Sequence, residues 1–293
     1  MRLVSFAFES SSPLVGAVVE EGTGQVVVDL TEPLSELGAT RMEDLVAFDG
    51  PAWPAIRALI GTGDTAGLPQ HPLDSVTLLP PVLNPMQMLF VRANYPTLAG
   101  ARPPLERPAF FSKLPSATIG DGANILLPAM SNQVDWEGEL AFVIGRHASH
   151  VAREDALDYI AGYTITNDIT ARDLQAAGEP ALAKNFRTFS PLGPWLVTTD
   201  EVGDPHRLGI RQWVNETLFQ DGNTSDMVFD IPAIIAFLSS VTDLYPGDVV
   251  ATGAPAGVGL HQDPPIFLSA GDTLRIEIQG VGVLNNQVMA ATA

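Results

Sequence analysis

Three acidic side chains in the middle of the chain are the residues best suited to chemistry. The segment VDWEGELAFVIGR (134–146) carries Glu137 and Glu139, and its apolar second half is typical of a buried strand. Side chains two residues apart on a strand leave the same face, so the two carboxylates would lie roughly 7 Å apart. A third carboxylate, Asp168, directly follows the predicted strand GYTITN (162–167).

Carboxylates gathered beside a buried strand need a compensating charge. They repel one another, and burying them without a partner costs free energy. A hard cation removes both penalties, and an oxygen-only ligand set favours Mg²⁺, with Mn²⁺ or Ca²⁺ possible. The spacing alone leaves two simpler interpretations open. Glu137 and Glu139 could lie on a solvated strand face, and Asp168 could cap the following helix.

Other kinds of reactive site find little support in the sequence. The chain has no cysteine, which excludes disulfides, thiolate nucleophiles and zinc–thiolate centres. His147 and His150 follow a glycine turn, so we expect them on the surface. There is no G-x-S-x-G motif, and the glycine turn at 257–259 is not followed by a helical pattern, which argues against a dinucleotide site.

The charge balance limits the possible partners. The 293 residues include 34 acids and 15 basic residues, for a net charge of −19, which disfavours nucleic acid and anionic membranes as partners. No apolar stretch reaches the roughly 18 residues of a membrane helix. Because segment 1–16 does not resemble a signal peptide, we expect a cytoplasmic protein.

One short segment departs from this acidic character. Residues 90–120 carry Arg92, Arg102, Arg107 and Lys113 against a single acid, Glu106. Two interpretations are open, a chance cluster on a surface loop or a segment that attracts an anionic ligand.

The elements that must position these groups fall into two predicted parts. Residues 1–75 predict a small β-rich module, with β-branched runs followed by helical patterns at 41–48 and 53–60. The proline-rich stretch LLPPVLNP (78–85) marks the transition to a larger unit, 76–293.

Strands outnumber helices in the larger unit, without regular alternation between the two. This pattern favours an α+β fold over a doubly wound sheet. Helices are expected near 154–160, 170–176 and 231–240, and the last has Pro232 in its first turn.

Five segments together resemble the fumarylacetoacetate hydrolase family. They occur in the order and with the spacing typical of that family, and the resemblance covers about 86–290. The segments are PAFFSKLPSATIG (108–120), VDWEGELAFVIGR (134–146), AGYTITNDITARDLQ (161–175), KNFRTFSPLGPWLVT (184–198) and TGAPAGVG (252–259).

The resemblance implies a mixed β-sheet roll, a homodimer and a divalent metal near the mouth of the roll. The family pattern Asp-aromatic-Glu-x-Glu implies Glu137 and Glu139 as ligands, and Asn-Asp-x-Thr-Ala-Arg-Asp implies Asp168 as the third.

The resemblance also implies roles for other side chains. Lys113, in the Phe-x-Lys segment, and Lys184, which opens the Lys-x-Phe segment, are expected to be catalytic. Arg172, Gln175 and Thr252 match positions that bind substrate, although Arg172 and Gln175 could instead only tie their helix to its neighbours.

The sequence departs from the family at the positions that activate water. Related acylpyruvases have a His–Glu pair in Gly-x-Asn-Tyr-x-x-His-x-x-Glu, whereas this chain has Leu98 and Ala101, and neither can move a proton. Either another residue supplies the base, with Glu106, Lys113 and Lys184 as candidates, or the reaction needs no activated water, or activity has been lost.

Three further departures concern the substrate. Arg92, Arg187 and Ala254 replace typical family residues, and Arg92 could hold a substrate carboxylate or form a salt bridge at the pocket rim.

These features together predict a Mg²⁺-dependent enzyme that acts on a small anionic 2-oxo acid or 1,3-dicarbonyl acid. Its metal would stabilise an enolate. Hydrolytic cleavage of a C–C bond is expected slightly ahead of a lyase or isomerase reaction, namely decarboxylation, keto–enol isomerisation or dehydration. A third alternative is a non-catalytic protein that binds metal and metabolite.

Overall fold

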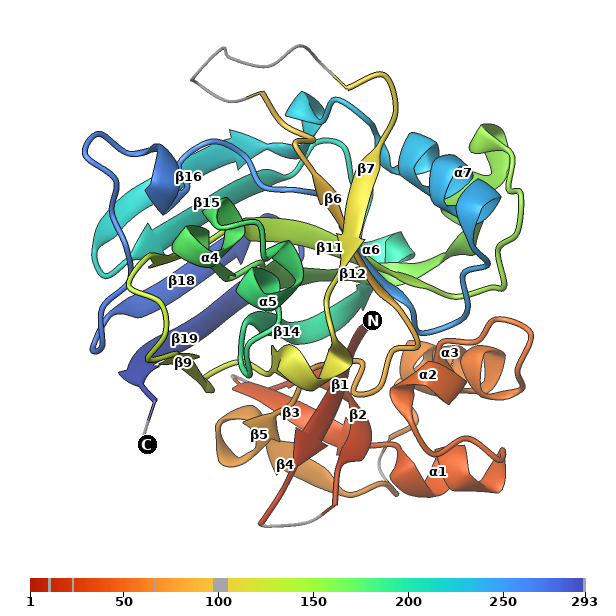
Figure 1. The fold of residues 1–293 in the computed structure, drawn as a ribbon. Coiled ribbons are helices and arrows are strands. Elements are labelled where there is room, and N and C mark those ends of the chain that lie inside the picture. Colours follow the sequence, from red (N-terminus) through yellow and green to blue (C-terminus); the bar gives the residue numbers. More distant parts are fainter. Residues whose placement is uncertain (10–11, 23, 66, 97–104, 292–293) are drawn as a thin grey trace.

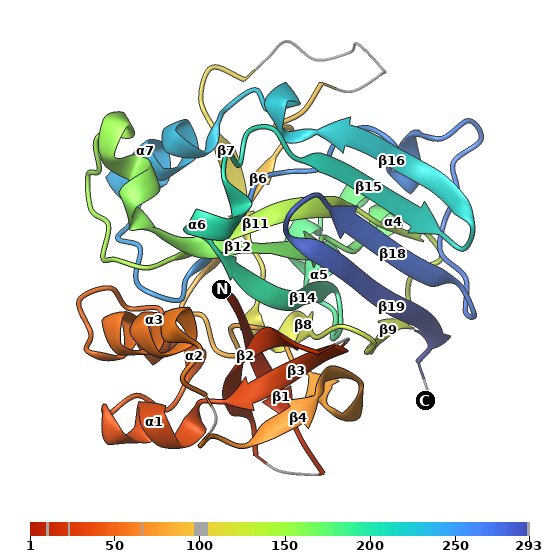
Figure 2. The same ribbon diagram turned by 180° about the vertical axis from the view of Figure 1, so that it is seen from behind.

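The computed structural model describes residues 1–9, 12–22, 24–65, 67–96 and 105–291. Figures 1 and 2 show the fold from opposite sides, with the N-terminal elements gathered at one end of the molecule. Strands dominate and most helices are short, so the expected α+β class is confirmed.

A mixed sheet runs through the molecule. Its strands are β1 (Arg2–Ala7), β2 (Leu14–Glu21), β3 (Gly24–Asp29), β4 (Gln70–Pro72), β5 (Thr77–Leu78), β6 (Met88–Arg92), β7 (Ala109–Ser112), β8 (Thr118–Ile119), β11 (Gly138–Ile144), β12 (Ile160–Asn167), β14 (Ser190–Thr198) and β17 (Val249–Ala251). The order across this main sheet is β4-β3-β2-β1-β14-β12-β11-β17-β6-β7, with β5 beside β1 and β8 beside β14.

Two smaller sheets complete the strand structure. One contains β16 (Thr217–Asn223), β15 (Gly209–Val214), β18 (Thr273–Ile278), β19 (Gly282–Ala290) and β9 (Asn124–Leu127), in this spatial order. The other pairs β10 (Val134–Asp135) with β13 (Thr170–Ala171). In Figure 2 the five-stranded sheet lies to one side of the main sheet.

Helices are found mainly at the periphery. They are α1 (Thr31–Glu36), α2 (Met42–Leu45), α3 (Ala52–Thr62), α4 (Arg172–Ala176), α5 (Pro180–Lys184), α6 (Thr199–Val202) and α7 (Ile231–Val241), with 3₁₀ turns η1 (Leu73–Ser75), η2 (Pro115–Ala117), η3 (Arg153–Tyr159), η4 (Thr224–Asp226) and η5 (Gly259–His261). α7 starts as predicted, since the Asp230 side chain accepts the Ala233 amide at 2.9 Å. Across the described residues, no helix is both long enough and apolar enough to span a membrane.

The central strand β11 has a different core on each face. Leu140 and Phe142 belong to a cluster with residues of α7 and the five-stranded sheet, such as Ile276. Ala141 and Val143 point the other way, into a cluster that includes residues of the N-terminal helices. Burying each large apolar side chain contributes about 1.5–3 kcal/mol at most. Glu139 shares the face of Ala141, because alternate residues on a strand point to the same side.

The N-terminal part is continuous with the rest of the main sheet. β1 pairs with β14 in antiparallel register, with Arg2 opposite Val197. Helices α2 and α3 lie within or close to the two helical patterns predicted for this part. One sheet and one apolar cluster include residues from both predicted parts. The division into 1–75 and 76–293 stays a prediction.

Candidate metal centre and its charged surroundings

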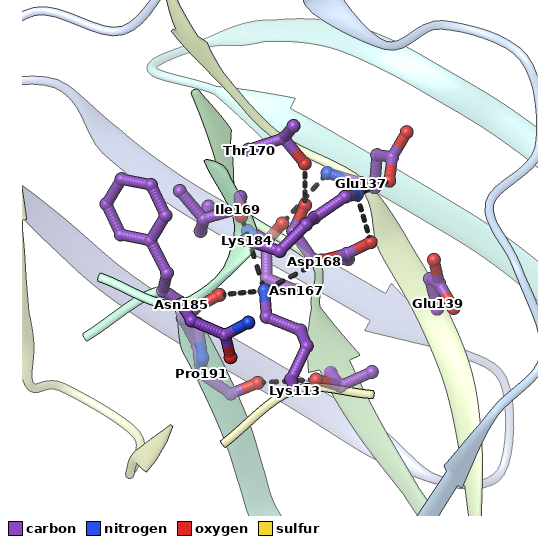
Figure 3. A network of polar contacts seen from close by, with 12 residues as sticks. Lys113, Glu137, Glu139, Asn167, Asp168, Ile169, Thr170, Lys184, Asn185 and Pro191 are labelled. Carbon is purple, nitrogen blue, oxygen red and sulfur yellow. Dashed lines mark hydrogen bonds and ion pairs between the residues drawn. The ribbon is translucent and has the colours of Figure 1, made fainter. Parts of the chain in front are cut away.

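The three predicted ligands come together in the structure. Glu137 directly precedes β11, Glu139 is the second residue of that strand, and Asp168 directly follows β12 (Figure 3). One carboxylate oxygen from each residue lies within 4.8 Å of the others. Glu139 and Asp168 are buried, while the Glu137 side chain keeps 18% of its surface exposed. Asp168 caps no helix, since the residue before α4 is Ala171.

Backbone hydrogen bonds fix the spacing of the ligands. β11 and β12 are antiparallel neighbours, with Glu139 opposite Thr166. Just beyond the strands, the Asp168 amide donates to the Glu137 carbonyl at 2.8 Å, and the Glu137 amide donates to Asn167 Oδ1 at 3.0 Å. The sequence predicted both glutamates on one face of the same strand. In the structure Glu137 lies just before the strand, where these two hydrogen bonds hold it.

The glycine between the two glutamates is packed against buried amides. The Gly138 amide donates to Gln220 Oε1 at 2.9 Å, and a Cβ at this position would lie 2.5 Å from Gln212 Oε1. A larger residue would therefore require either the Gln212 side chain or the peptide between the two glutamates to shift. Sequence reasoning missed both glutamines, because they reach the site from β15 and β16 and no local pattern marks them.

The Lys113 ammonium uses all of its donors within the protein and holds Asp168 in place. Its buried Nζ donates to Asp168 Oδ1 at 2.7 Å, to the Ile169 carbonyl at 3.2 Å and to the Phe189 carbonyl at 2.6 Å. An ammonium has three donors, and all three have acceptors here. Burial lowers the pKa of Lys113 to about 8, and the charge of Asp168 limits this decrease. These contacts support a positioning role more directly than the expected catalytic one.

Lys184 contacts Glu137, the partly exposed member of the cluster. It ends α5, and its Nζ donates to Glu137 Oε2 at 3.0 Å and to Asp168 Oδ2. The same Nζ lies 4.8 Å from the centre of the Phe111 ring, within reach of a cation–π interaction. Burial opposes the charge, but the Asp168 and Glu137 carboxylates raise the pKa of Lys184 above its ordinary value. Lys184 therefore stays a cation with one N–H not used in these two bonds.

Arg172 joins the cluster to a second layer of buried groups. Its Nε donates to Asp135 Oδ1 at 2.6 Å, and its Nη2 donates to Glu137 Oε1 at 2.7 Å. Its Nη1 donates to Gln175 Oε1 at 3.2 Å, so Arg172 and Gln175 contact each other as their spacing on α4 predicts. Burial works against ionisation of Glu137, but Arg172 and Lys184 hold its pKa well below the ordinary value.

Asp135 is a buried site residue that the sequence reasoning did not single out. One of its oxygens accepts from Arg172 Nε and the other from the Leu260 amide at 2.8 Å. The side chain therefore fixes the orientation of the guanidinium that contacts Glu137. Its place in the Asp-aromatic-Glu-x-Glu pattern was the available signal.

Glu139 is the ligand candidate without a cationic partner. Its Oε2 accepts the Gly253 amide at 2.7 Å, and the ion pairs among the described residues do not include Glu139. Burial, followed by the nearby Asp168 and Glu137 carboxylates, raises the pKa of Glu139 well above its ordinary value. A buried carboxylate that faces two others and lacks a counter-ion fits a divalent cation. The donor set is therefore suited to a hard metal ion.

Two of the predicted substrate-binding residues have different surroundings. Thr252 is fully buried, and both its amide and its hydroxyl donate to the Leu140 carbonyl at 2.9 Å. It has no donor left for a ligand in this arrangement, because the chain after β17 continues to pair with β11. Arg92 ends β6 with an exposed side chain.

The remaining candidates of the sequence analysis lie outside the cluster. Leu98 and Ala101 lie outside the described residues. Glu106 and Arg187 are exposed, and no bond of theirs to the three carboxylates is present in the described part of the chain.

The family relationship follows from comparison with known proteins. Residues 89–289 match the family described as fumarylacetoacetate (FAA) hydrolase C-terminal, which is more than half of the chain. The chain belongs to this family. Its membership confirms the expected enzyme class in broad form, a hydrolase or a lyase/isomerase of the fumarylacetoacetate hydrolase family.

Relatives of similar length exist among both curated proteins and solved structures. "Oxaloacetate tautomerase fahd2, mitochondrial" of Xenopus laevis is 38% identical over 297 residues, covering 99% of this chain and 90% of the relative. A maleylpyruvate hydrolase from Sphingobium sp. SYK-6, solved with manganese(II) and pyruvate, has a TM-score of 0.82 and 33% identity, with 100% of each chain covered. A 5-carboxymethyl-2-hydroxymuconate delta-isomerase from Mycobacterium smegmatis has a TM-score of 0.79 and 34% identity, covering 99% of this chain and 100% of its own. The family fold expected from the sequence is thus confirmed.

Proposed function

We propose that this protein is a Mg²⁺-dependent tautomerase that interconverts the keto and enol forms of oxaloacetate or a closely related 2-oxo acid. The observation that carries the proposal is the convergence of Glu137, Glu139 and Asp168 beside the Lys184 ammonium. In the forward direction the C3–H bond breaks, a C2–C3 double bond forms, and the oxo oxygen gains a proton. No water molecule is consumed.

Tautomerisation agrees with the residues at the water-activating positions. Hydrolysis needs a general base, whose loss typically lowers the rate by about 10²–10⁴. Leu98 and Ala101 cannot act as one. A reaction that only moves a proton between carbon and oxygen still needs a proton acceptor and a proton donor, but it needs no activated water, and the Xenopus laevis relative is named an oxaloacetate tautomerase. We therefore rank isomerisation ahead of hydrolysis, the reverse of the order favoured by the sequence.

Each side chain of the cluster has its own role in the proposed reaction. Glu137, Glu139 and Asp168 would hold the ion, and Mg²⁺, Mn²⁺ or Ca²⁺ suits their oxygens. When bound, a divalent ion supplies Lewis-acid stabilisation of negative charge on the carboxylate and oxo oxygens of the substrate. Lys184 has an N–H left to donate to the oxo oxygen as its charge grows. Lys113 keeps Asp168 in position, and Arg172 does the same for Glu137.

The charge of the buried groups also agrees with an anionic substrate. Four carboxylates, those of Asp135 and the three ligands, face the cations of Lys113, Lys184 and Arg172. With all of them ionised, the cluster has one excess negative charge. A divalent ion changes this to one excess positive charge, which attracts an organic acid even though the whole chain is strongly acidic. The Gln175 amide, next to Arg172, remains a candidate to orient that acid.

Hydrolytic cleavage of an acylpyruvate is the second candidate function. It is favoured by the similarity to the maleylpyruvate hydrolase over the full length of both chains. The cluster would serve this reaction equally well, because charge also develops on an oxo oxygen when a C–C bond breaks. The two candidates differ only in the need for an activated water molecule.

One assay separates the candidates. The ultraviolet absorbance of enol-oxaloacetate would be followed with protein and Mg²⁺, with protein and EDTA, and with Mg²⁺ alone. We expect Mg²⁺-dependent acceleration by the native protein, a loss of at least about 10²-fold for Asp168→Asn, and no change for Glu154→Gln on the exposed η3 turn. Enol decay at the uncatalysed rate would contradict the proposal, and Mg²⁺-dependent loss of acylpyruvate absorbance would support hydrolysis instead.

A further inference from the structure

We propose that Arg92 binds the second carboxylate of a 2-oxo dicarboxylic acid and makes the enzyme prefer diacids to monoacids. This inference rests on the proposed function, because it assumes that the first carboxylate and the oxo group of the substrate face the three acidic ligands.

Sheet register places Arg92 at the level of Glu139. Ala141 of β11 pairs with Ala251 of β17, and Ala251 pairs with Phe90 of β6. β11 runs antiparallel to β17, and β17 runs parallel to β6. A step of two residues from this row therefore leads to Glu139 in β11 and to Arg92 in β6, in the same direction along the sheet. With neighbouring strands about 4.8 Å apart, regular sheet spacing would put their Cα atoms about 10 Å apart.

Side-chain alternation places the two residues on the same face of the sheet. In β6, Leu89 and Val91 belong to the core cluster of the face that carries Leu140. Phe90 belongs to the cluster of the opposite face, together with Ala141. Because alternate residues share a face, Arg92 lies on the side of Phe90, and Glu139 lies on the side of Ala141. This is one and the same side.

An aromatic pair lies on that face, one step of two residues before Arg92 along β6. The rings of Phe90 and Phe111 stack with centroids 5.7 Å apart, on the neighbouring strands β6 and β7 (Figure 1). Lys184 Nζ lies 4.8 Å from the Phe111 ring, and Lys113 Nζ lies 5.4 Å from the Phe90 ring. The two lysines that bind the carboxylates therefore contact an aromatic surface on the same face of the sheet as Arg92.

The Arg92 guanidinium is also one of the few that are not already engaged. Among the described arginines, only Arg92 and Arg187 have neither an acidic partner nor an aromatic ring beneath them. Each of the other described arginines has an acidic partner or an aromatic ring beneath it; these are Arg2, Arg41, Arg57, Arg107, Arg146, Arg153, Arg172, Arg207, Arg211 and Arg275. In a chain with 34 acids and 15 basic residues, an unpaired arginine beside an acidic cluster is available to an external carboxylate. Its planar fork can hold that carboxylate by two parallel hydrogen bonds.

The first test measures binding with unreactive ligands. Malate and lactate both offer a carboxylate and a neighbouring hydroxyl to the metal, but only malate has a second carboxylate. In calorimetric titrations with Mg²⁺ present, we expect Arg92→Gln to weaken malate binding by roughly tenfold to a hundredfold, the loss typical of a charge-assisted pair. Lactate binding should change by less than about twofold. Arg92→Lys should recover part of the malate affinity, since it keeps the charge but loses the fork.

Control variants separate Arg92 from general charge effects. Arg207→Gln removes one positive charge at a side chain that is 83% exposed and paired with Asp204, so it should not alter the malate preference. The assignment would be overturned if Arg92→Gln weakened malate and lactate equally, or if Arg187→Gln and not Arg92→Gln removed the preference. The melting temperature of each variant checks that the exposed substitution leaves the fold intact.

The second test uses turnover. Arg92→Gln should raise KM for enol-oxaloacetate by a similar factor and leave KM for the monoacid enol-phenylpyruvate nearly unchanged. An Arg92-dependent malate preference in a protein that tautomerises neither compound would contradict the proposed function and support the diacid site. Tautomerisation with the same loss for both substrates in Arg92→Gln would contradict the diacid site alone.

Discussion

Glu139 differs from the other two acidic ligands in what balances its charge. Glu137 and Asp168 each contact two cationic side chains, whereas Glu139 has a single backbone amide. Its raised pKa, caused first by burial and then by the other carboxylates, favours the protonated form without a metal. A metal ion needs the ionised form. We therefore expect metal binding to release a proton from Glu139.

Calorimetry can measure that coupling. We expect Mg²⁺ or Mn²⁺ to displace up to one proton near neutral pH, so the apparent binding enthalpy should vary with the ionisation enthalpy of the buffer. The affinity should fall as the pH falls, because protons then compete for Glu139. Glu139→Gln should reduce the buffer dependence and weaken binding. A native protein with the same enthalpy in every buffer would show that Glu139 is already ionised.

Lys113 offers a test of stability at the residue scale. Lys113→Met leaves the buried Asp168 carboxylate and the Ile169 and Phe189 carbonyls without their shared donor. Removing one partner of a buried ion pair costs about 3–5 kcal/mol, which urea denaturation would measure. The same substitution should cost clearly less in an Asp168→Asn background, because the unpaired charge is then absent. Equal costs in both backgrounds would rule out the pair as the source of the effect.

At the scale of elements, the chain after β17 connects the acidic cluster to the end of β6. Gly253 has φ +93° and donates its amide to Glu139. A Cβ there would lie 3.0 Å from the Asn94 Cβ and 3.1 Å from the Val91 carbonyl. The Asn94 amide group in turn donates to the Thr252 carbonyl at 2.8 Å. The position of one proposed metal ligand thus depends on a left-handed glycine and on an asparagine just after β6.

Gly253→Ala should affect both stability and metal binding. The backbone conformation predicts a cost of about 1–3 kcal/mol, and the displaced amide predicts a loss of roughly 10- to 100-fold in Mn²⁺ affinity. Gly271→Ala is the matched control, because Gly271 has φ +99° but a Cβ added there would meet no atom within 4 Å. It should lose stability and keep its Mn²⁺ affinity. If both variants kept the native affinity, the amide of Gly253 would not orient Glu139.

Local sequence patterns identified many of the elements but not all of them. α7 was predictable because Asp230 and Pro232 give a clear start, and β11 because its apolar run is long enough to cross the core. β19 (GVLNNQVMA) was missed, since two asparagines in its middle disfavour a strand. Pairing with β18 on one side and β9 on the other overrides that preference, and such pairing partners cannot be read from the segment itself.

The candidate site shows the same limit. Family motifs identified the three ligands, the two lysines and Arg172, which are all part of the cluster. The structure additionally contributes Gln212 and Gln220, whose roles depend on strands far away in sequence. Their residue types have no special meaning outside the folded chain.

At the scale of the whole molecule, the N-terminal segment forms part of the support of the site. Leu34 and Met42 share an apolar cluster with Phe90, Ala141 and Val143, which come from the strands that carry Arg92 and Glu139. The N-terminal amine also forms an ion pair with Glu201 at 2.6 Å. The small module and the larger unit therefore share one core.

Deleting residues 1–75 should prevent the remainder from folding. The deletion exposes one apolar face of the main sheet and removes the antiparallel partner of β14. We expect segment 76–293 to aggregate or to give a poorly dispersed amide NMR spectrum. Co-expression with segment 1–75 as a separate chain should restore part of the signal. A stable, well-dispersed spectrum of 76–293 alone would support two independent domains. Sedimentation of the intact chain tests the homodimer that the family resemblance implies.

The three acidic ligands are held by pairing between β11 and β12, and by the bonds that join the residues just beyond these strands. Both strands are fully buried, and neither depends on the ion for its hydrogen bonds. The backbone around the site is therefore preorganised. We expect a metal ion to bind to the folded protein without driving its folding, unlike in small zinc domains. Under the proposed function, we accordingly expect the protein to keep its fold without the divalent ion and to regain activity when the ion returns.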